Sequence, residues 1–205
     1  MLKHLFRYRH PDIWKQLYTA LVRPHLEYAV QAWKPNLNRD IVRLEKVQRR
    51  ATKIPYQLHS MEYADRLTYL GLTDLVTRRS RGDLIQVFKL LNGIEKMEDR
   101  CLPKCAPSRV STGPASSTRG NSQKLQREKF PAVIKNKFGS AVALRHNYFS
   151  NRVVPLWNKL PDEVIRAPNL NIFKGKLDNF MSKTRMMSGV ATSGYRRISC
   201  SGRNK

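Results

Sequence analysis

Residues 38–54 read NRDIVRLEKVQRRATKI, a stretch in which five basic side chains recur at alternating intervals of four and three residues. On an α-helix of about 3.6 residues per turn, that spacing keeps all five on one narrow stripe. A different side of the same helix carries apolar side chains that can pack against a core. The basic stripe consists of Arg39, Arg43, Lys46, Arg50 and Lys53, and the apolar side consists of Ile41, Leu44, Val47 and Ala51.

The basic stripe is typical of a surface that follows a phosphate backbone, although a solvated helix face would carry the same pattern. The whole chain contains 39 basic and 15 acidic side chains, which gives a net charge of +24. Such an excess favours nucleic acid, an anionic membrane or an acidic protein as the partner, and it says little about the fold.

The sequence contains no long apolar segment. A membrane-spanning helix needs about 18 or more uncharged apolar residues in a row, and no such run is present. The N-terminus is basic and aromatic and lacks the apolar stretch and cleavage site of a signal peptide. We therefore expect a nuclear or cytoplasmic protein that is neither secreted nor bound to a membrane.

Helix signals divide residues 1–94 into short helices joined by tight turns. Asp12 can cap the first helix, and Pro24 either kinks it or begins a second helix over residues 24–33. Short turns between helices are what helix-hairpin packing requires. This part of the chain is therefore expected to form a helical bundle.

The later helices of this bundle have recognisable ends. Asn38 is expected to cap the helix of the basic stripe, Gly71 to end the next helix, and Gly93 to end a longer one. Within that longer helix Arg79 and Asp83 lie four residues apart, so they are expected to pair across one turn.

The second half of the chain has a different composition. Residues 95–129 are rich in Ser, Thr, Gly and Pro and predict a flexible basic linker. Residues 130–181 predict a smaller compact helical unit, whose last helix is capped by Asn169. Residues 182–205 predict a disordered basic tail. The expected fold is mainly α: a short helical bundle, a basic loop and a smaller helical C-terminal unit.

Catalytic motifs are not visible in the sequence. It has no Gly-rich phosphate loop, and acidic residues are too scarce to suggest a two-metal site. Asp65 lies in a YADR sequence that superficially resembles a polymerase box, but Arg66 occupies the place of the second carboxylate. Cys101 and Cys105 lack a matching pair of zinc ligands. We therefore predict no catalytic residue, no metal site and no cofactor.

The aromatic side chains fall into two groups. Core packing is the simpler interpretation for most of them, including Trp14, Trp33 and Trp157. Three tyrosines among basic residues and histidines could instead stack on unpaired bases. These three are Tyr8, Tyr56 and Tyr148.

Three long segments carry a more specific pattern. Residues 17–54 (LYTALVRPHLEYAVQAWKPNLNRDIVRLEKVQRRATKI), residues 63–93 and residues 147–180 occur in an order that resembles reverse transcriptases of non-LTR retrotransposons. The resemblance is to the jockey-like and chicken-repeat-like LINE elements, in the region C-terminal to the catalytic palm. It implies a thumb and post-thumb segment of an RNA-directed DNA polymerase.

In such a protein the thumb helices hold the template–primer duplex through its phosphates rather than its base edges. The resemblance therefore implies that the basic stripe faces an RNA–DNA duplex. It also implies that the palm domain of such a protein is a second possible partner. Other positions that match family motifs are expected to have structural roles: residues 22–24, Glu27, Tyr28, Arg78, Arg79, Arg81, Gly82 and Asp83.

The resemblance begins almost at Met1, so we expect the palm with its paired aspartates and the endonuclease to be absent. The expected function is then sequence-independent binding of nucleic acid without catalysis. The alternative is a decayed or truncated retroelement remnant with no independent function.

Overall fold

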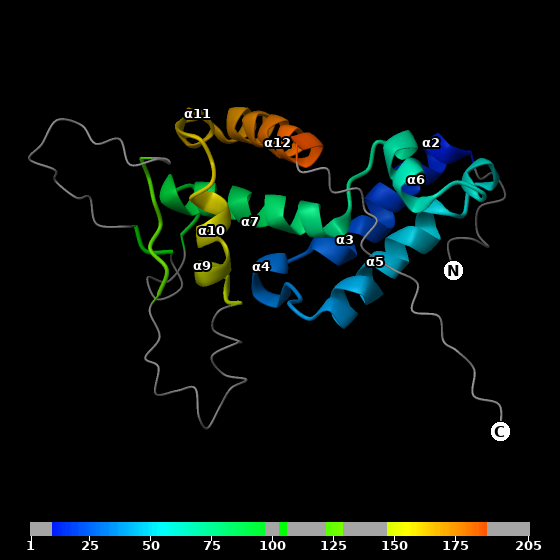
Figure 1. Ribbon diagram of the computed structural model, residues 1–205, viewed down its shortest axis with the longest axis horizontal. Coiled ribbons are helices and arrows are strands. Elements are labelled where there is room, and N and C mark those ends of the chain that lie inside the picture. The colour runs from blue at the N-terminus through cyan, green and yellow to red at the C-terminus, as the bar shows by residue number, and fades with distance from the viewer. Residues whose placement is uncertain (1–9, 97–102, 106–121, 129–146, 188–205) are drawn as a thin grey trace, which may run out of the picture.

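The computed structural model describes residues 10–96, 103–105, 122–128 and 147–187 (Figure 1). Regular structure in these ranges is helical, and the β pairing in them is one isolated bridge between Cys105 and Leu125. This confirms the mainly α fold predicted from the sequence. Within the same ranges, no helix has the length and apolar character needed to cross a membrane. The predictions for Tyr8, Cys101 and residues 188–205 lie outside the described residues.

The first helical segment runs through Pro24 instead of stopping there. It consists of α2 (Pro11–Leu17), the π-helical turn η1 (Tyr18–Val22) and α3 (Arg23–Glu27). Pro24 has no N–H to donate to the preceding turn, and a π-helical turn just before it accommodates the missing hydrogen bond. The helix starts earlier than expected, because His10 rather than Asp12 is the N-cap residue.

The predicted helix over residues 24–33 is broken in the structure. Tyr28 is extended and Ala29 adopts a left-handed conformation with φ of 47°, after which α4 (Val30–Trp33) begins. A left-handed alanine costs about 1 kcal/mol, so the surroundings must compensate for it. The indole N–H of Trp33 donates to the carbonyl of Tyr28 at 2.5 Å, and Val30 is buried.

Three helical elements surround a small core at one end of the molecule. They are α5 (Asn38–Thr52), the 3₁₀ turn η2 (Tyr56–Leu58) and α6 (Tyr63–Leu70), and α2 packs against them (Figure 1). Asn38 is the first helical residue of α5 and not its cap, which is Leu37. Gly71 ends α6 in the left-handed region with φ of 60°, as the sequence predicts. The core residues are Tyr18, Ala51, Leu58, Tyr63, Leu67, Leu70 and Leu72.

The long helix α7 (Leu75–Leu91) runs through the centre of the molecule (Figure 1). The Asp74 carboxylate caps it by accepting from the backbone N–H of Thr77 at 2.8 Å. Gly93 follows the helix in the left-handed conformation. Near the middle of α7, a Cβ on Gly82 would lie 3.7 Å from a methyl carbon of Val30, so α4 crosses α7 closely at this point.

The C-terminal unit is built from α9 (Phe149–Arg152), α10 (Val154–Trp157), α11 (Asp162–Ile165) and α12 (Leu170–Met187). As the sequence predicts, Asn169 caps α12, accepting from the backbone N–H of Ile172 at 2.9 Å. The helix continues to Met187, beyond the expected start of the tail at residue 182.

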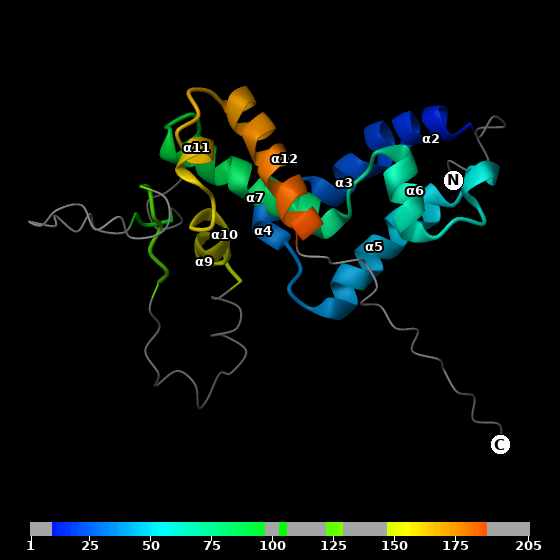
Figure 2. The same cartoon turned by 45° about the horizontal axis from the view of Figure 1, so that its top comes forward.

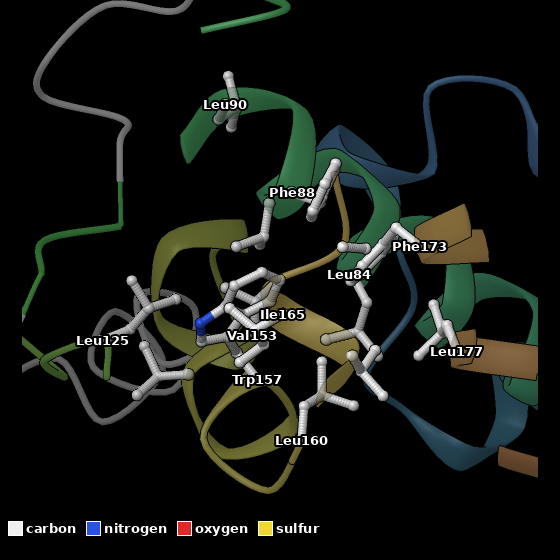
Figure 3. Packing of buried hydrophobic residues seen from close by; sticks show 14 of the residues in the cluster. Leu84, Phe88, Leu90, Leu125, Val153, Trp157, Leu160, Ile165, Phe173 and Leu177 are labelled. Atoms are coloured by element: carbon white, nitrogen blue, oxygen red, sulfur yellow. The ribbon is translucent and has the colours of Figure 1, made fainter. Parts of the chain in front are cut away.

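The core of this unit includes the second half of α7 (Figure 3). Trp157 is fully buried at its centre, and the rings of Phe88 and Phe173 stack at 4.2 Å between centroids. The predicted unit boundary at residue 94 therefore does not separate two cores, because α7 contributes to the core of the C-terminal unit. The residues of α7 in this cluster are Leu84, Val87, Phe88 and Leu90.

Part of the predicted linker also belongs to this core. Leu125 is 3% exposed, and its backbone N–H and C=O bond the side chain of Asn158 at 2.9 and 3.0 Å. The indole of Trp157 donates to the carbonyl of Gln123 at 2.8 Å. Residues 122–128 are therefore docked on the C-terminal unit, because side-chain amides and the indole pair with backbone groups that no strand or helix satisfies.

Asp83 on α7 joins the two halves of the chain through buried ion pairs. Its carboxylate, which is fully buried, accepts from the ammonium of Lys34 at 2.9 Å and from the guanidinium of Arg152 at 3.0 Å. Arg152 also donates to the carbonyls of Val30 and Gln31. The predicted pair of Arg79 and Asp83 is therefore wrong, because cations from α9 and from the residue after α4 occupy the carboxylate.

Replacing Asp83 with Asn should destabilise the protein strongly. The D83N variant would leave Lys34 and Arg152 without their buried countercharge, which typically costs about 3–5 kcal/mol. The measurement is the free energy of unfolding from urea titration followed by circular dichroism.

The matched control is D178N, which removes the ion pair of Asp178 with Arg81 between α12 and α7. Those side chains are 52% and 25% exposed, so the loss should be about 1 kcal/mol or less. Equal losses in the two variants would contradict the role assigned to Asp83.

Candidate nucleic-acid interface

All five residues of the basic stripe are exposed in the structure. Four lie on α5 and the fifth, Lys53, is its C-cap residue with a helical backbone conformation. The side chains of Arg39 and Arg43 are 74% and 76% exposed. With a rise of 1.5 Å per residue, the stripe is about 21 Å long. The expected geometry of a continuous row of cations is therefore present on this helix.

The helix that carries the basic stripe lies at an edge of the described structure. In Figures 1 and 2, α5 forms the lower edge of its half of the structure, with α2 and α6 above it. One carboxylate accompanies the stripe: Asp40 lies 3.7 Å from both Arg39 and Arg43. Within the described residues, Lys46, Arg50 and Lys53 form no ion pair. Most of the charge is thus free to meet an external anion.

The buried side of α5 differs from the predicted one. Of the four expected apolar residues, only Ala51 is buried; Ile41 and Leu44 are half-buried, and Val47 is 40% exposed. The buried positions are largely polar and lie opposite the stripe on the helix. They are Glu45, Gln48, Ala51 and Thr52.

Gln48 holds α5 to three neighbouring segments. Its amide oxygen accepts from the hydroxyl of Tyr18 at 2.7 Å, and its amide nitrogen donates to the hydroxyl of Tyr63 and the carbonyl of Thr73 at 3.0 and 3.1 Å. A buried, fully paired amide of this kind fixes a helix in one rotation about its axis. The stripe is directed outward because Gln48 directs the opposite side inward.

Glu45 extends this network toward α7. Its carboxylate accepts hydrogen bonds from the Tyr63 hydroxyl and from the backbone N–H of Leu75. Burial raises the pKa of Glu45, and the bonds from Tyr63 and Leu75 oppose that shift. Burial likewise raises the pKa values of Tyr18 and Tyr63, so both hydroxyls remain protonated donors.

Arg79 is a buried cation that interacts electrostatically with the Glu45 carboxylate. It is 2% exposed, and its two terminal nitrogens have no hydrogen-bond partner among the described residues. Burial lowers the pKa of Arg79, while Glu45, Asp74 and Glu27 oppose the shift. The side chain therefore supplies positive charge to the polar network through space instead of through a direct hydrogen bond.

The C-terminal part of α5 is held by two further contacts. The indole of Trp14 donates to the carbonyl of Ala51 at 2.7 Å, which places α2 against the last turn of α5. The guanidinium carbon of Arg49 lies 4.4 Å from the centre of the Tyr63 ring, which joins α5 to α6. Both contacts help to fix the position of α5, which carries the basic stripe.

The other sequence-derived candidates are placed apart from the stripe. Asp65 is exposed on the outer side of α6, which is a helix and not a polymerase-type hairpin. Trp14 and Trp157 are buried as expected, whereas Trp33 is 39% exposed. Cys105 is an exposed free thiol. Among the described residues, no group of three or more His, Cys, Asp or Glu side chains could hold a metal ion.

The polar network on α5 was not recognised from the sequence. Its signal is the pair Glu45 and Gln48, three residues apart on the side of the helix opposite the five cations. Polar residues such as Glu45 and Gln48 normally indicate an exposed helix side. They indicate a buried side here only once Tyr18 and Tyr63 are known to lie beside them as hydrogen-bond partners.

Replacing Gln48 with Ala should lower the free energy of unfolding by about 2–4 kcal/mol. The substitution leaves the buried Tyr18 hydroxyl without its partner, removes the bond to the half-buried Thr73 carbonyl and creates a cavity. Urea titration checks this, with V47A on the same helix as the control, for which a change within about 0.5 kcal/mol is expected. A small effect of Q48A would show that α5 is held mainly by other contacts.

The E45Q variant should change how stability depends on pH. Because burial raises the pKa of Glu45, the unfolded chain loses this proton at a lower pH than the folded one. The wild-type free energy of unfolding should therefore fall relative to that of E45Q as pH rises through and above the range in which an ordinary glutamate titrates, near about pH 4. Unfolding curves that stay parallel over this range would contradict the assignment.

Comparison with protein-family models, with curated proteins and with solved structures found no match for this chain. The mainly α fold therefore rests on the structure itself. The resemblance to non-LTR reverse transcriptases remains a prediction from the sequence, and the candidate interface is defined by the residues described above.

Proposed function

We propose that this protein binds the phosphate backbone of a nucleic-acid duplex through the basic stripe of α5, without reading the base sequence. The observation that carries the proposal is the row of five exposed cations on a helix whose opposite side is fixed by Gln48. A stripe of about 21 Å covers over half a turn of a duplex, whose turn is about 34 Å. It can therefore meet several phosphates at once.

Sequence-independent binding follows from the chemistry of the side chains. Lysine and arginine on an exposed helix side contact phosphate oxygens, which are the same for every base pair. The resemblance to the thumb of non-LTR reverse transcriptases supports an RNA–DNA template–primer duplex as the ligand and a palm domain as a further partner. The proposal assigns binding alone and includes no catalytic step.

Affinity should fall steeply with salt. Each phosphate neutralised on a duplex contributes about −0.9 to the slope of log K against log salt, so five contacts give a slope of about −4 to −5. Fluorescence anisotropy with two RNA–DNA duplexes of unrelated sequence measures both the slope and the sequence dependence. A flat salt dependence, or binding to one sequence only, would sink the proposal and favour the interpretation as a remnant without function.

Reversing three stripe charges should test the location of the interface. The variant R43E/K46E/R50E should weaken binding to both duplexes equally and reduce the salt slope by roughly three. The control is K104E/K159E/K183E, which changes the net charge by the same amount at exposed lysines away from α5. Equal loss in the two triple variants would mean that overall charge, and not the stripe, determines binding.

A further inference from the structure

Tyr56 is the most exposed large hydrophobic side chain in the described part of the chain, at 90%. It lies in the 3₁₀ turn η2, directly after the end of the basic stripe. A ring exposed to this extent contributes almost nothing to the packing of the core and is free to contact a ligand.

The backbone around Tyr56 is firmly held. Pro55 is buried on one side of it, and Leu58, which is 1% exposed, enters the core of Tyr18 and Leu67 on the other. Backbone hydrogen bonds run from Leu58 to Pro55 and from His59 to Tyr56, both at 3.1 Å. The ring is therefore presented to solvent from an anchored turn rather than from a loose loop.

The turn that carries Tyr56 also lies close to the end of the basic stripe. Three peptide units separate Lys53 from Tyr56, so their Cα atoms lie at most about 11 Å apart. A strand that follows the stripe and continues past Lys53 thus passes within reach of the ring. Aromatic side chains beside a basic track are how single-stranded nucleic acid is held without sequence preference.

Other exposed tyrosines of the described chain lie away from the basic stripe. Tyr28 follows α3 and is 81% exposed, and Tyr148 precedes α9 and is 59% exposed. Tyr18 and Tyr63 are buried and use their hydroxyls in the polar network. Tyr69 is 59% exposed, but it lies on the outer side of α6, one turn after Asp65. Exposed carboxylates on that side would repel a phosphate backbone, which makes Tyr69 a matched control for an exposed tyrosine.

We propose that Tyr56 stacks on an unpaired base where a strand leaves the duplex held by the basic stripe. The favoured ligand is then a duplex with an adjoining single-stranded extension, and not a blunt duplex. This inference rests on the proposed function and specifies its substrate further. Stacking of one base on an aromatic side chain corresponds to about fivefold to a hundredfold in affinity.

The test compares labelled RNA–DNA probes by fluorescence anisotropy: a blunt duplex and the same duplex with a short unpaired extension on either strand. Wild type should bind one of the extended probes at least about fivefold more tightly than the blunt probe. Y56A should lose this preference while binding the blunt duplex as wild type does. Y56F, which keeps the ring, and Y69A should retain the preference.

The outcomes separate the two proposals. Binding of the blunt duplex through the stripe, without any preference for an extension or with a preference that survives in Y56A, overturns the role of Tyr56 alone. Failure of wild type to bind any probe overturns the proposed function and this inference together. Since Tyr56 contributes almost no buried surface, thermal unfolding of Y56A should match that of wild type, which excludes a folding defect as the cause.

Discussion

The buried carboxylate of Asp83 is the constraint on which the arrangement of the helices depends. It lies in the middle of α7 and receives Lys34 from the chain after α4 and Arg152 from α9. Removing three charged groups from water is costly, and the cost is recovered only when each finds its partner in good geometry. Because Arg152 also holds the carbonyls of Val30 and Gln31, few alternative placements of α4 and α9 would satisfy the same groups.

The two cores on either side of Asp83 differ in their composition. Around Trp157 the buried side chains are mainly apolar, and the stacked rings of Phe88 and Phe173 join α7 to α12. Beneath α5 the core is mixed, with hydroxyl, amide and carboxylate groups bonded to one another. An apolar core tolerates small rotations of a helix, whereas a hydrogen-bonded one does not. The stricter core lies directly behind the candidate interface.

The sequence was sufficient to predict much of what depends on local physics, although His10 and Leu37 take the N-cap positions expected for Asp12 and Asn38. Helical periodicity, the left-handed stop at Gly71, the Asn169 cap and the exposed stripe of α5 all follow from side chains close together along the chain. Sequence reasoning failed where distant residues decide. The predicted pair of Arg79 and Asp83 satisfied the spacing rule, yet Asp83 is taken by Lys34 and Arg152, which lie 49 and 69 positions away.

The inner side of α5 was mispredicted for a related reason. Hydrophobicity alone assigned Val47 to the core and left Gln48 outside, because the hydroxyls that make Gln48 a favourable core residue come from η1 and α6. One short stretch of the predicted linker differs for the same reason: composition indicated a flexible segment, but Asn158 and Trp157 supply partners for the backbone of residues 123–125.

The bridge between Cys105 and Leu125 has a consequence for how this protein can vary. It pairs two positions that lie 20 residues apart in the chain, and Leu125 belongs to the C-terminal core. Closing a loop costs free energy that grows only with the logarithm of its length, about 0.6 kcal/mol for each doubling. Insertions or deletions between the two anchors should therefore be accepted with little loss of stability, which makes this the natural place for related chains to differ in length.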